Sequence, residues 1–238
     1  MYEPRFYRNW HKDDDLVSFE AIIKETDLCI RAEKNLQKKA LASILKHREA
    51  IEKYIARHPE FLKALAPVTL ERDAPLIVKD MIEYTRTANV GPMASVAGVI
   101  AEYVGNDLLE YSSEIIVENG GDIFIKTNKP RLVGVYAGNS VFTKKIALEI
   151  LPEKTPLGIC TSSGTVGPSL SFGKADAVII TAKSAILADA AATSIGNIIK
   201  EETDIAKALD MAQTIKGLKG IIIIKNDKMG LWGDISIK

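Results

Sequence analysis

Residues 157 to 199 carry only four charged side chains, in a chain in which 26% of all residues are charged. Charged residues are rarely buried without a partner, so a long stretch almost free of them belongs inside a protein. We therefore predict that this stretch is largely interior. It contains a strand that leads into Cys160, a second apolar strand over 175–182 and a helix over 185–200, for which Ser184 is a good N-cap.

The rest of the chain supplies further strands and helices in an irregular order. Strands are expected at 16–23 and 26–32, and helices at 34–57, 76–88 and 93–104. A hairpin is expected over 113–126, further strands of the same sheet at 131–138 and 145–151, and a closing hairpin over 221–237. Because strands and helices do not alternate strictly, we predict an α+β fold with mixed or antiparallel sheets and packed helices.

The length allows one domain or two tight subdomains. The connector over 66–75 is too short to separate domains clearly, so we predict a single domain over 1–238.

Composition and sequence argue against several classes of protein. The formal net charge is zero, which gives no electrostatic reason to expect nucleic acid or an anionic membrane. No stretch approaches the roughly 20 apolar residues of a membrane span, and no apolar signal core follows the N-terminus. Cys29 and Cys160 are the only cysteines and lie far apart in the sequence. A disulfide framework is therefore not expected, which favours a reducing compartment. These features predict a cytoplasmic protein, for which a homodimer is plausible.

The stretch over 158–177 is unusually dense in hydroxyls and glycines, including Thr161, Ser162, Ser163, Gly164 and Thr165. Convergent hydroxyls and free amides form a good cradle for phosphate, although such runs are commonly loops that satisfy their own backbone. The segment over 167–174 does not match a phosphate-binding P-loop, because five residues rather than four separate its glycines.

A second glycine-rich segment, Asn119-Gly120-Gly121-Asp122, separates two apolar strands. Asn-Gly is a strong hairpin signal, so a plain turn explains the segment. The alternative is that bare glycine backbone lets a planar or phosphorylated ligand approach closely, with Asp122 as an acceptor beside it.

Asp189 and Thr193 are four residues apart on a predicted helix and therefore share one of its faces. A carboxylate with a hydroxyl suits Mg²⁺, which completes its coordination with water and phosphate oxygens. The alternative is a first-turn aspartate favoured by the helix dipole, with Thr193 bonding back to a carbonyl.

The histidines and the cysteine at the end of the strand are not predicted to be catalytic. His11, His47 and His58 share no metal-ligand spacing, and His47 is expected to be solvated on its helix. Cys160 is expected to be a small buried residue.

In their order along the chain, NGGD, TSSGT and ADAAAT resemble the blocks of the ApbE superfamily, whose enzymes transfer FMN from FAD to a protein threonine. The chain is most similar to a short, largely uncharacterised branch with the blocks ETDLCIRA, VGPMASVAGVIAEYVG and CTSSGTVGPSLSFGKADA. The resemblance implies an ApbE-like α+β fold with a flavin-type pocket. It implies that Asp189 and Thr193 bind Mg²⁺, and that Asn119–Asp122 and Thr161–Thr165 border FAD.

This sequence departs from the enzymes in two blocks. No histidine follows TSSGT, where the enzymes carry one. Their AKGxxxD block becomes Ala97-Gly98 followed by Glu102, so that the lysine is absent and the aspartate is lengthened.

Three hypotheses follow. The first hypothesis is a protein that binds a flavin or related nucleotide with Mg²⁺, and that cleaves the nucleotide or transfers it to an acceptor protein. The second hypothesis, favoured by the two departures, is a non-catalytic cofactor-binding or accessory protein in sulfur or redox metabolism. The third is that it binds no nucleotide.

Overall fold

The computed structural model describes Arg8 and residues 15–165 and 171–238, and it confirms the predicted α+β class. Its centre is an eight-stranded sheet in the order β1-β2-β3-β4-β7-β8-β9-β10, in which every neighbouring pair is antiparallel. A second sheet contains only β5 and β6.

The bounds of the elements are as follows. The strands are β1 (Val17–Ile23), β2 (Thr26–Ala32), β3 (Ile115–Asn119), β4 (Asp122–Lys126), β5 (Arg131–Gly134), β6 (Ala147–Ile150), β7 (Leu157–Ser162), β8 (Ala177–Ala182), β9 (Leu218–Lys225) and β10 (Lys228–Gly233). The α-helices are α1 (Gln37–Arg57), α2 (Pro59–Lys63), α3 (Leu76–Thr87), α4 (Val96–Leu108), α5 (Ala185–Ile198) and α6 (Asp204–Thr214), and the short 3₁₀ helices are η2 (Pro92–Ser95) and η3 (Pro152–Lys154).

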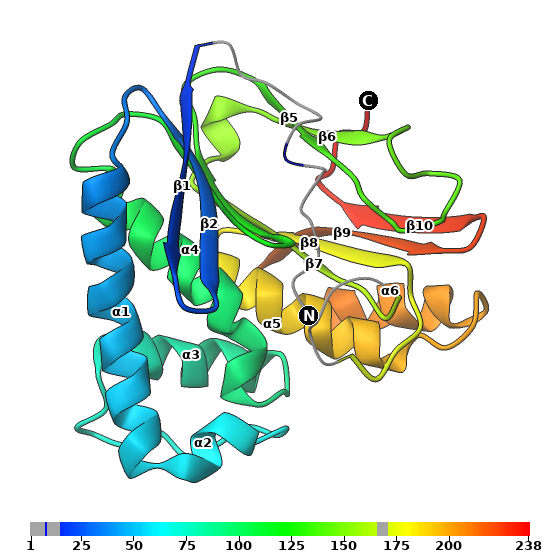
Figure 1. Ribbon diagram of the computed structural model, residues 1–238. Helices are drawn as coiled ribbons and strands as arrows, with labels where there is room; N and C mark the ends of the chain where they lie inside the picture. Colours follow the sequence, from blue (N-terminus) through cyan, green and yellow to red (C-terminus); the bar gives the residue numbers. More distant parts are fainter. Residues whose placement is uncertain (1–7, 9–14, 166–170) are drawn as a thin grey trace.

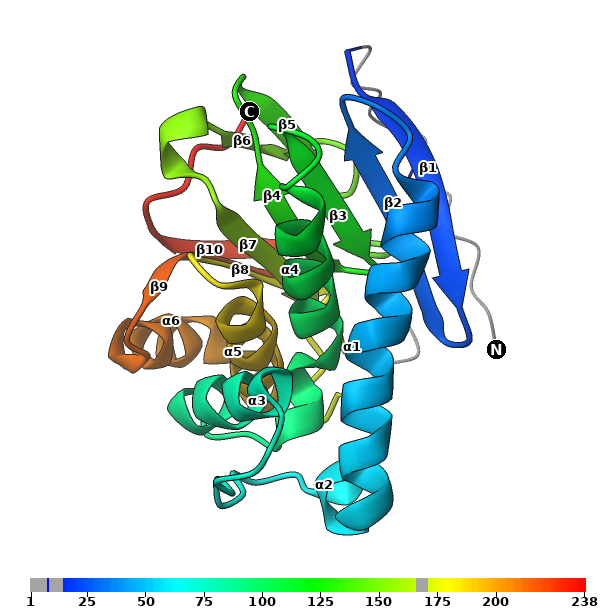
Figure 2. The same cartoon turned by 90° about the vertical axis from the view of Figure 1, so that its left-hand side faces the viewer.

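The main sheet lies between two unequal layers. All the long helices gather on one of its faces, and β5 and β6 lie across the other (Figures 1 and 2). Helix α5 is the innermost helix, since it contacts α3, α4, α6 and the strands β7 and β8. Most of its residues are buried, as expected for the charge-poor stretch.

The placement of 131–138 and 145–151 in the main sheet is wrong. Strands β5 and β6 pair with each other, and Leu148 and Ile150 join a second apolar cluster with Leu157 and Ile159 of the main sheet. The outer face of the main sheet is itself apolar, so it needs a covering layer rather than another strand at its edge. Arg131 anchors this layer through a buried ion pair with Glu114 at 2.9 Å.

The expectation that His47 is solvated is also wrong. It faces α4, and its Nε2 lies 2.9 Å from Asp107 Oδ2, which also accepts a hydrogen bond from Ser43 Oγ at 2.8 Å. Burial lowers the pKa of His47, an effect that the hydrogen bond and charge of Asp107 partly oppose. Its side chain thus belongs to the packing between α1 and α4.

Arg8 gives a testable anchor on the outer face of β1–β3. Its guanidinium lies 2.8 Å from Glu118 and 3.0 Å from Asp27, and all three side chains are largely buried. Removing one member of a buried ion pair leaves the other charge buried without that partner. We therefore expect Arg8→Met to lower the free energy of unfolding by about 2 kcal/mol. Arg57→Met is the control, because Arg57 pairs with Asp73 only at 3.9 Å on the surface. Equal urea-unfolding midpoints for the two variants would contradict this role of Arg8.

Among the described residues, no helix is both long and apolar enough to span a bilayer.

Candidate functional site

The strand pairing places the side chains of Asn119 and Asp122, at the two ends of the NGGD turn, on the helix-covered face of the main sheet, which also carries Phe124 and Cys160. Asn119 and Asp122 are paired at the ends of β3 and β4, and Gly120 adopts the positive φ of 70° that such a tight turn requires. The segment is therefore a hairpin turn, as its local sequence indicates. It also makes a contact that a plain turn does not explain, because Asn119 Nδ2 donates a hydrogen bond to the Ala97 carbonyl at 3.1 Å.

The first half of the TSSGT segment contacts this turn and α5. The Thr161 amide donates to the Gly121 carbonyl at 3.0 Å, and a Cβ added to Gly121 would lie 2.8 Å from the Thr161 carbonyl oxygen. A Cβ added to Gly196 of α5 would lie 3.2 Å from Ser162 Oγ. Thr161 and Ser162 therefore join the NGGD turn to the helix that carries Asp189.

The second half of the TSSGT segment forms its own turn. The Thr165 amide donates to Ser163 Oγ at 3.1 Å, and the Gly164 amide donates to the Ala175 carbonyl at 2.9 Å. Thr165 Oγ1 also lies 3.4 Å from Asp176 Oδ1. In this half the polar groups satisfy the local backbone, as the loop alternative states. Residues 167–170 of the segment compared with a P-loop lie outside the described residues.

Asp189 points from α5 toward the start of α4. It is the fifth residue of α5, and its Oδ2 accepts a hydrogen bond from the Gly98 amide at 2.8 Å, so the first-turn dipole explanation does not apply to it. Burial raises the pKa of Asp189 well above the ordinary range, and the charge of Asp122 raises it further, while the Gly98 and Ala97 amides oppose both effects. Thr193 is half-buried one turn further along α5.

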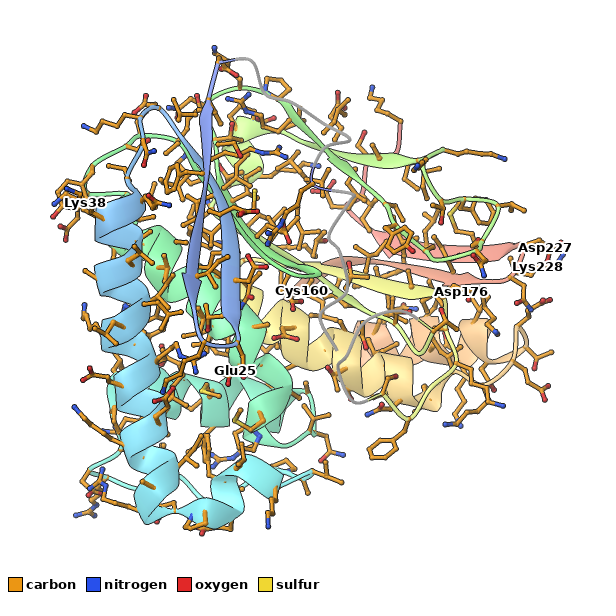
Figure 3. The ribbon with its side chains drawn as sticks, viewed as in Figure 1. Glu25, Lys38, Cys160, Asp176, Asp227 and Lys228 are labelled. Atoms are coloured by element: carbon orange, nitrogen blue, oxygen red, sulfur yellow. The ribbon has the colours of Figure 1, made fainter. Side chains whose placement is uncertain are left out.

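Cys160 lies between the sheet and α5 (Figure 3) and is fully buried, as expected. It is paired with Asp122 across β4 and β7, and its thiol donates to the Ala185 carbonyl at 3.3 Å. Burial raises the pKa of the thiol well above its usual value, and the charges of Asp122 and Asp189 add to the rise. A thiol held protonated in this way is a poor nucleophile.

The arrangement gathers two buried carboxylates, Asp122 and Asp189, with the half-buried hydroxyls of Thr161 and Thr193 and the backbone of Ala97 and Gly98. None of these groups is positively charged. Carboxylates whose charges repel each other across a buried site are favourable ligands for a hard cation. In the described part of the chain, no cluster of three or more histidine, cysteine or acidic side chains is suited to a metal, so such a cation would need further oxygens from water or ligand.

The structure thus brings together Asn119–Asp122, Thr161, Ser162 and Asp189, and it leaves Ser163–Thr165 at the margin. Their binding roles stay predictions. Sequence reasoning missed the Gly98 amide as the direct partner of Asp189. The only sequence signal for it is the Ala97-Gly98 pair in the AKGxxxD-like block.

Comparison with solved structures defines the class of fold. The chain is similar to the flavin transferase ApbE of Vibrio cholerae, with a TM-score of 0.61 at 12% identity, covering 93% of this chain and 97% of the other. It is also similar to the flavinyl transferase ApbE of Pseudomonas stutzeri, with a TM-score of 0.61 at 10% identity, covering 91% and 94%. At such low identity these likenesses establish an ApbE-like fold.

Sequence comparison then places the chain in a family. It belongs to the family whose model is described as "AbpE bacteria", which matches residues 8–231. The UPF0280 protein of Methanocaldococcus jannaschii is 47% identical over 220 residues, covering 90% of this chain and 89% of the relative. The UPF0280 protein of Methanococcus aeolicus is 46% identical over 198 residues, covering 81% and 80%. The predicted ApbE-like superfamily membership is confirmed.

Proposed function

We propose that this protein binds a flavin dinucleotide such as FAD together with Mg²⁺, and that it cleaves the diphosphate or transfers part of the nucleotide to an acceptor protein. The observation that carries the proposal is the buried pair Asp122 and Asp189 at the junction of the NGGD turn, β7 and α5. The likeness to flavin transferases of the same fold supports the ligand class.

The donor set fits a divalent cation. Asp189 would bind the cation through a carboxylate oxygen while its Oδ2 stays bonded to the Gly98 amide, with Thr193 as a hydroxyl ligand and Asp122 close by. When bound, Mg²⁺ supplies positive charge that neutralises phosphate oxygens. Because both carboxylates would repel a diphosphate, binding of the nucleotide should require the cation.

The nucleotide itself would be held mainly by backbone. Gly121 is exposed and would present bare backbone to a ligand at the turn, and the half-buried side chains of Thr161 and Ser162 would supply hydroxyls beside it. These groups bind and orient phosphate without adding charge. The proposed nucleotide site is bordered by the remaining residues of the two segments, which are Asn119, Gly120, Ser163, Gly164 and Thr165.

A non-catalytic binder is the second candidate. The described histidines lie away from the site: His47 is bonded to Asp107, and His58 lies against Glu60 and Glu71. No histidine follows the TSSGT segment. The described part of the site therefore has no histidine to act as a general base, and this difference from the enzymes favours binding without turnover.

Incubation of the protein with FAD and MgCl₂ separates the candidates. We expect FAD to bind with at least tenfold higher affinity in Mg²⁺ than in EDTA, which calorimetry measures readily. Accumulation of FMN or AMP supports the enzyme, and intact FAD bound with Mg²⁺ dependence supports the binder. Binding of FAD and ADP with equal weakness in both buffers would reject the proposed site.

A further inference from the structure

The helices α4 and α5 cap each other. At the start of α4, Ser95 occupies the N-cap position but donates its hydroxyl to the Pro92 carbonyl at 3.0 Å. The Gly98 amide in the first turn is satisfied instead by Asp189 of α5 at 2.8 Å. The first amides of a helix have no partner within the helix, so a carboxylate from a neighbour fills the role of a cap.

The reverse contact is made one turn further along α4. Glu102 Oε2 accepts hydrogen bonds from Ser184 Oγ at 2.8 Å and from the Ala185 amide at 2.6 Å, both at the start of α5. The Ile186 amide lies 3.3 Å from the same oxygen. Burial raises the pKa of Glu102, and the three hydrogen bonds oppose that rise.

Gly98 and Glu102 are four residues apart and therefore lie on one face of α4. Gly98 also sets the distance between the helices, because a Cβ at this position would overlap the Ala185 carbonyl oxygen and lie 2.8 Å from Asp189 Cβ. One face of α4 therefore contacts the beginning of α5 at two places. Glu102 accepts hydrogen bonds from the first amides of α5, and the Gly98 amide donates to the carboxylate of Asp189 one turn further on.

We infer that Glu102 is a positioning residue for Asp189, acting through Ser184 and the first turn of α5. The inference rests on the proposed function only in so far as Asp189 binds a cation. Glu102 itself would touch neither cation nor nucleotide. Its contacts fix the axial position of α5, so that one oxygen of Asp189 stays on the Gly98 amide and the carboxylate keeps a single orientation toward the site.

The variants are Glu102→Gln and a matched control, Asp107→Asn. Both replace a carboxylate of α4 by an amide of the same shape, and both weaken an anchor to a neighbouring helix, since Asp107 is bonded to Ser43 and His47 of α1. We expect Asp107→Asn to lower stability, because hydrogen bonds lower the pKa of Asp107, and Glu102→Gln to change stability less, because burial raises the pKa of Glu102. Only Glu102→Gln should weaken Mg²⁺ binding, measured by titration of MgCl₂ in the presence of ADP, by about tenfold.

A second readout needs no metal. Hydrogen exchange of the Gly98 amide, followed by NMR in EDTA, reports directly on its bond to Asp189. We expect exchange to be at least about tenfold faster in Glu102→Gln and unchanged in Asp107→Asn. Ser184→Ala, a milder change, should give an intermediate rate. The double variant Glu102→Gln/Ser184→Asp restores a carboxylate at the N-cap and should recover both protection and Mg²⁺ affinity.

The outcomes are separable. If the wild type binds no Mg²⁺ while Gly98 loses protection in Glu102→Gln, the proposed function fails and the positioning role stands. If folded Glu102→Gln keeps wild-type Gly98 protection and wild-type Mg²⁺ affinity, the positioning role is overturned.

Discussion

Asp189→Asn is expected to abolish most of the Mg²⁺ dependence of nucleotide binding while making the metal-free protein more stable. The amide keeps an oxygen for the Gly98 amide and removes the charge that repels Asp122. Loss of a metal ligand should weaken Mg²⁺ binding by at least about 10–100-fold. Removal of the buried charge should raise the free energy of unfolding in EDTA by about 1 kcal/mol, or about 2–4 °C in Tm.

The same substitution should change the dependence of stability on pH. The pKa of Asp189 is raised in the folded state, so folding is favoured where this group is protonated in both states. That contribution is lost as pH rises from the ordinary aspartate pKa, about 3.9, through the higher folded value. Asp189→Asn should flatten this loss in metal-free protein.

Calorimetry with ADP in Mg²⁺ and in EDTA, and thermal unfolding across pH, measure both effects. Asp210→Asn, on the exposed face of α6, is the control and should match the wild type. Thr193→Val should reduce Mg²⁺ dependence less than Asp189→Asn, because a neutral hydroxyl contributes less than a carboxylate. Wild-type Mg²⁺ dependence in Asp189→Asn would remove this residue from the proposed metal site.

Gly158→Ala is expected to be the most destabilising of the single substitutions considered. Gly158 lies in β7 directly beneath the start of α5, and a Cβ there would overlap the Cα and amide nitrogen of Ala185. These are backbone atoms, so the clash is relieved only by moving the helix away from the sheet. We expect a loss of at least about 3 kcal/mol, the upper part of the range for overpacking, and a Tm lowered by about 6–12 °C.

Gly196→Ala on α5 is the matched comparison. Its Cβ would meet only side-chain atoms, of which the nearest is Ser162 Oγ at 3.2 Å, and alanine favours a helix over glycine. Its stability should therefore stay within about 1 kcal/mol of the wild type. Urea unfolding of both variants measures the contrast, and a Gly158→Ala protein as stable as Gly196→Ala would show that α5 shifts away from β7 at little cost.

The elements with strong local signals were predictable from sequence. The apolar strand over 175–182 and Ser184 as an N-cap are present in the structure, because the relevant forces act within a few residues. The Asn119–Asp122 turn was also identified from its local sequence. The bounds of α4 were harder to predict. A helix was expected over 93–104, whereas the chain enters α4 through a 3₁₀ turn at Pro92 and the helix continues to Leu108.

The contacts that build the site were not predictable from local patterns. Asp189 lies 91 residues from its amide partner Gly98, and Ser184 lies 82 residues from Glu102. No periodicity reports such separations. His47 illustrates the same limit, because its helix has a second buried side that only the packing of α4 creates.

The buried state of α5 has a consequence for how the protein loses its candidate site on unfolding. This helix is enclosed by other helices and by β7 and β8, with almost no turn free to open into solvent. Segments of this kind exchange their amide hydrogens only when the whole cooperative unit unfolds. Heat or denaturant should therefore displace Asp189 in an all-or-none manner. A partly denatured sample should hold folded and unfolded molecules and no population in which only the site is loosened.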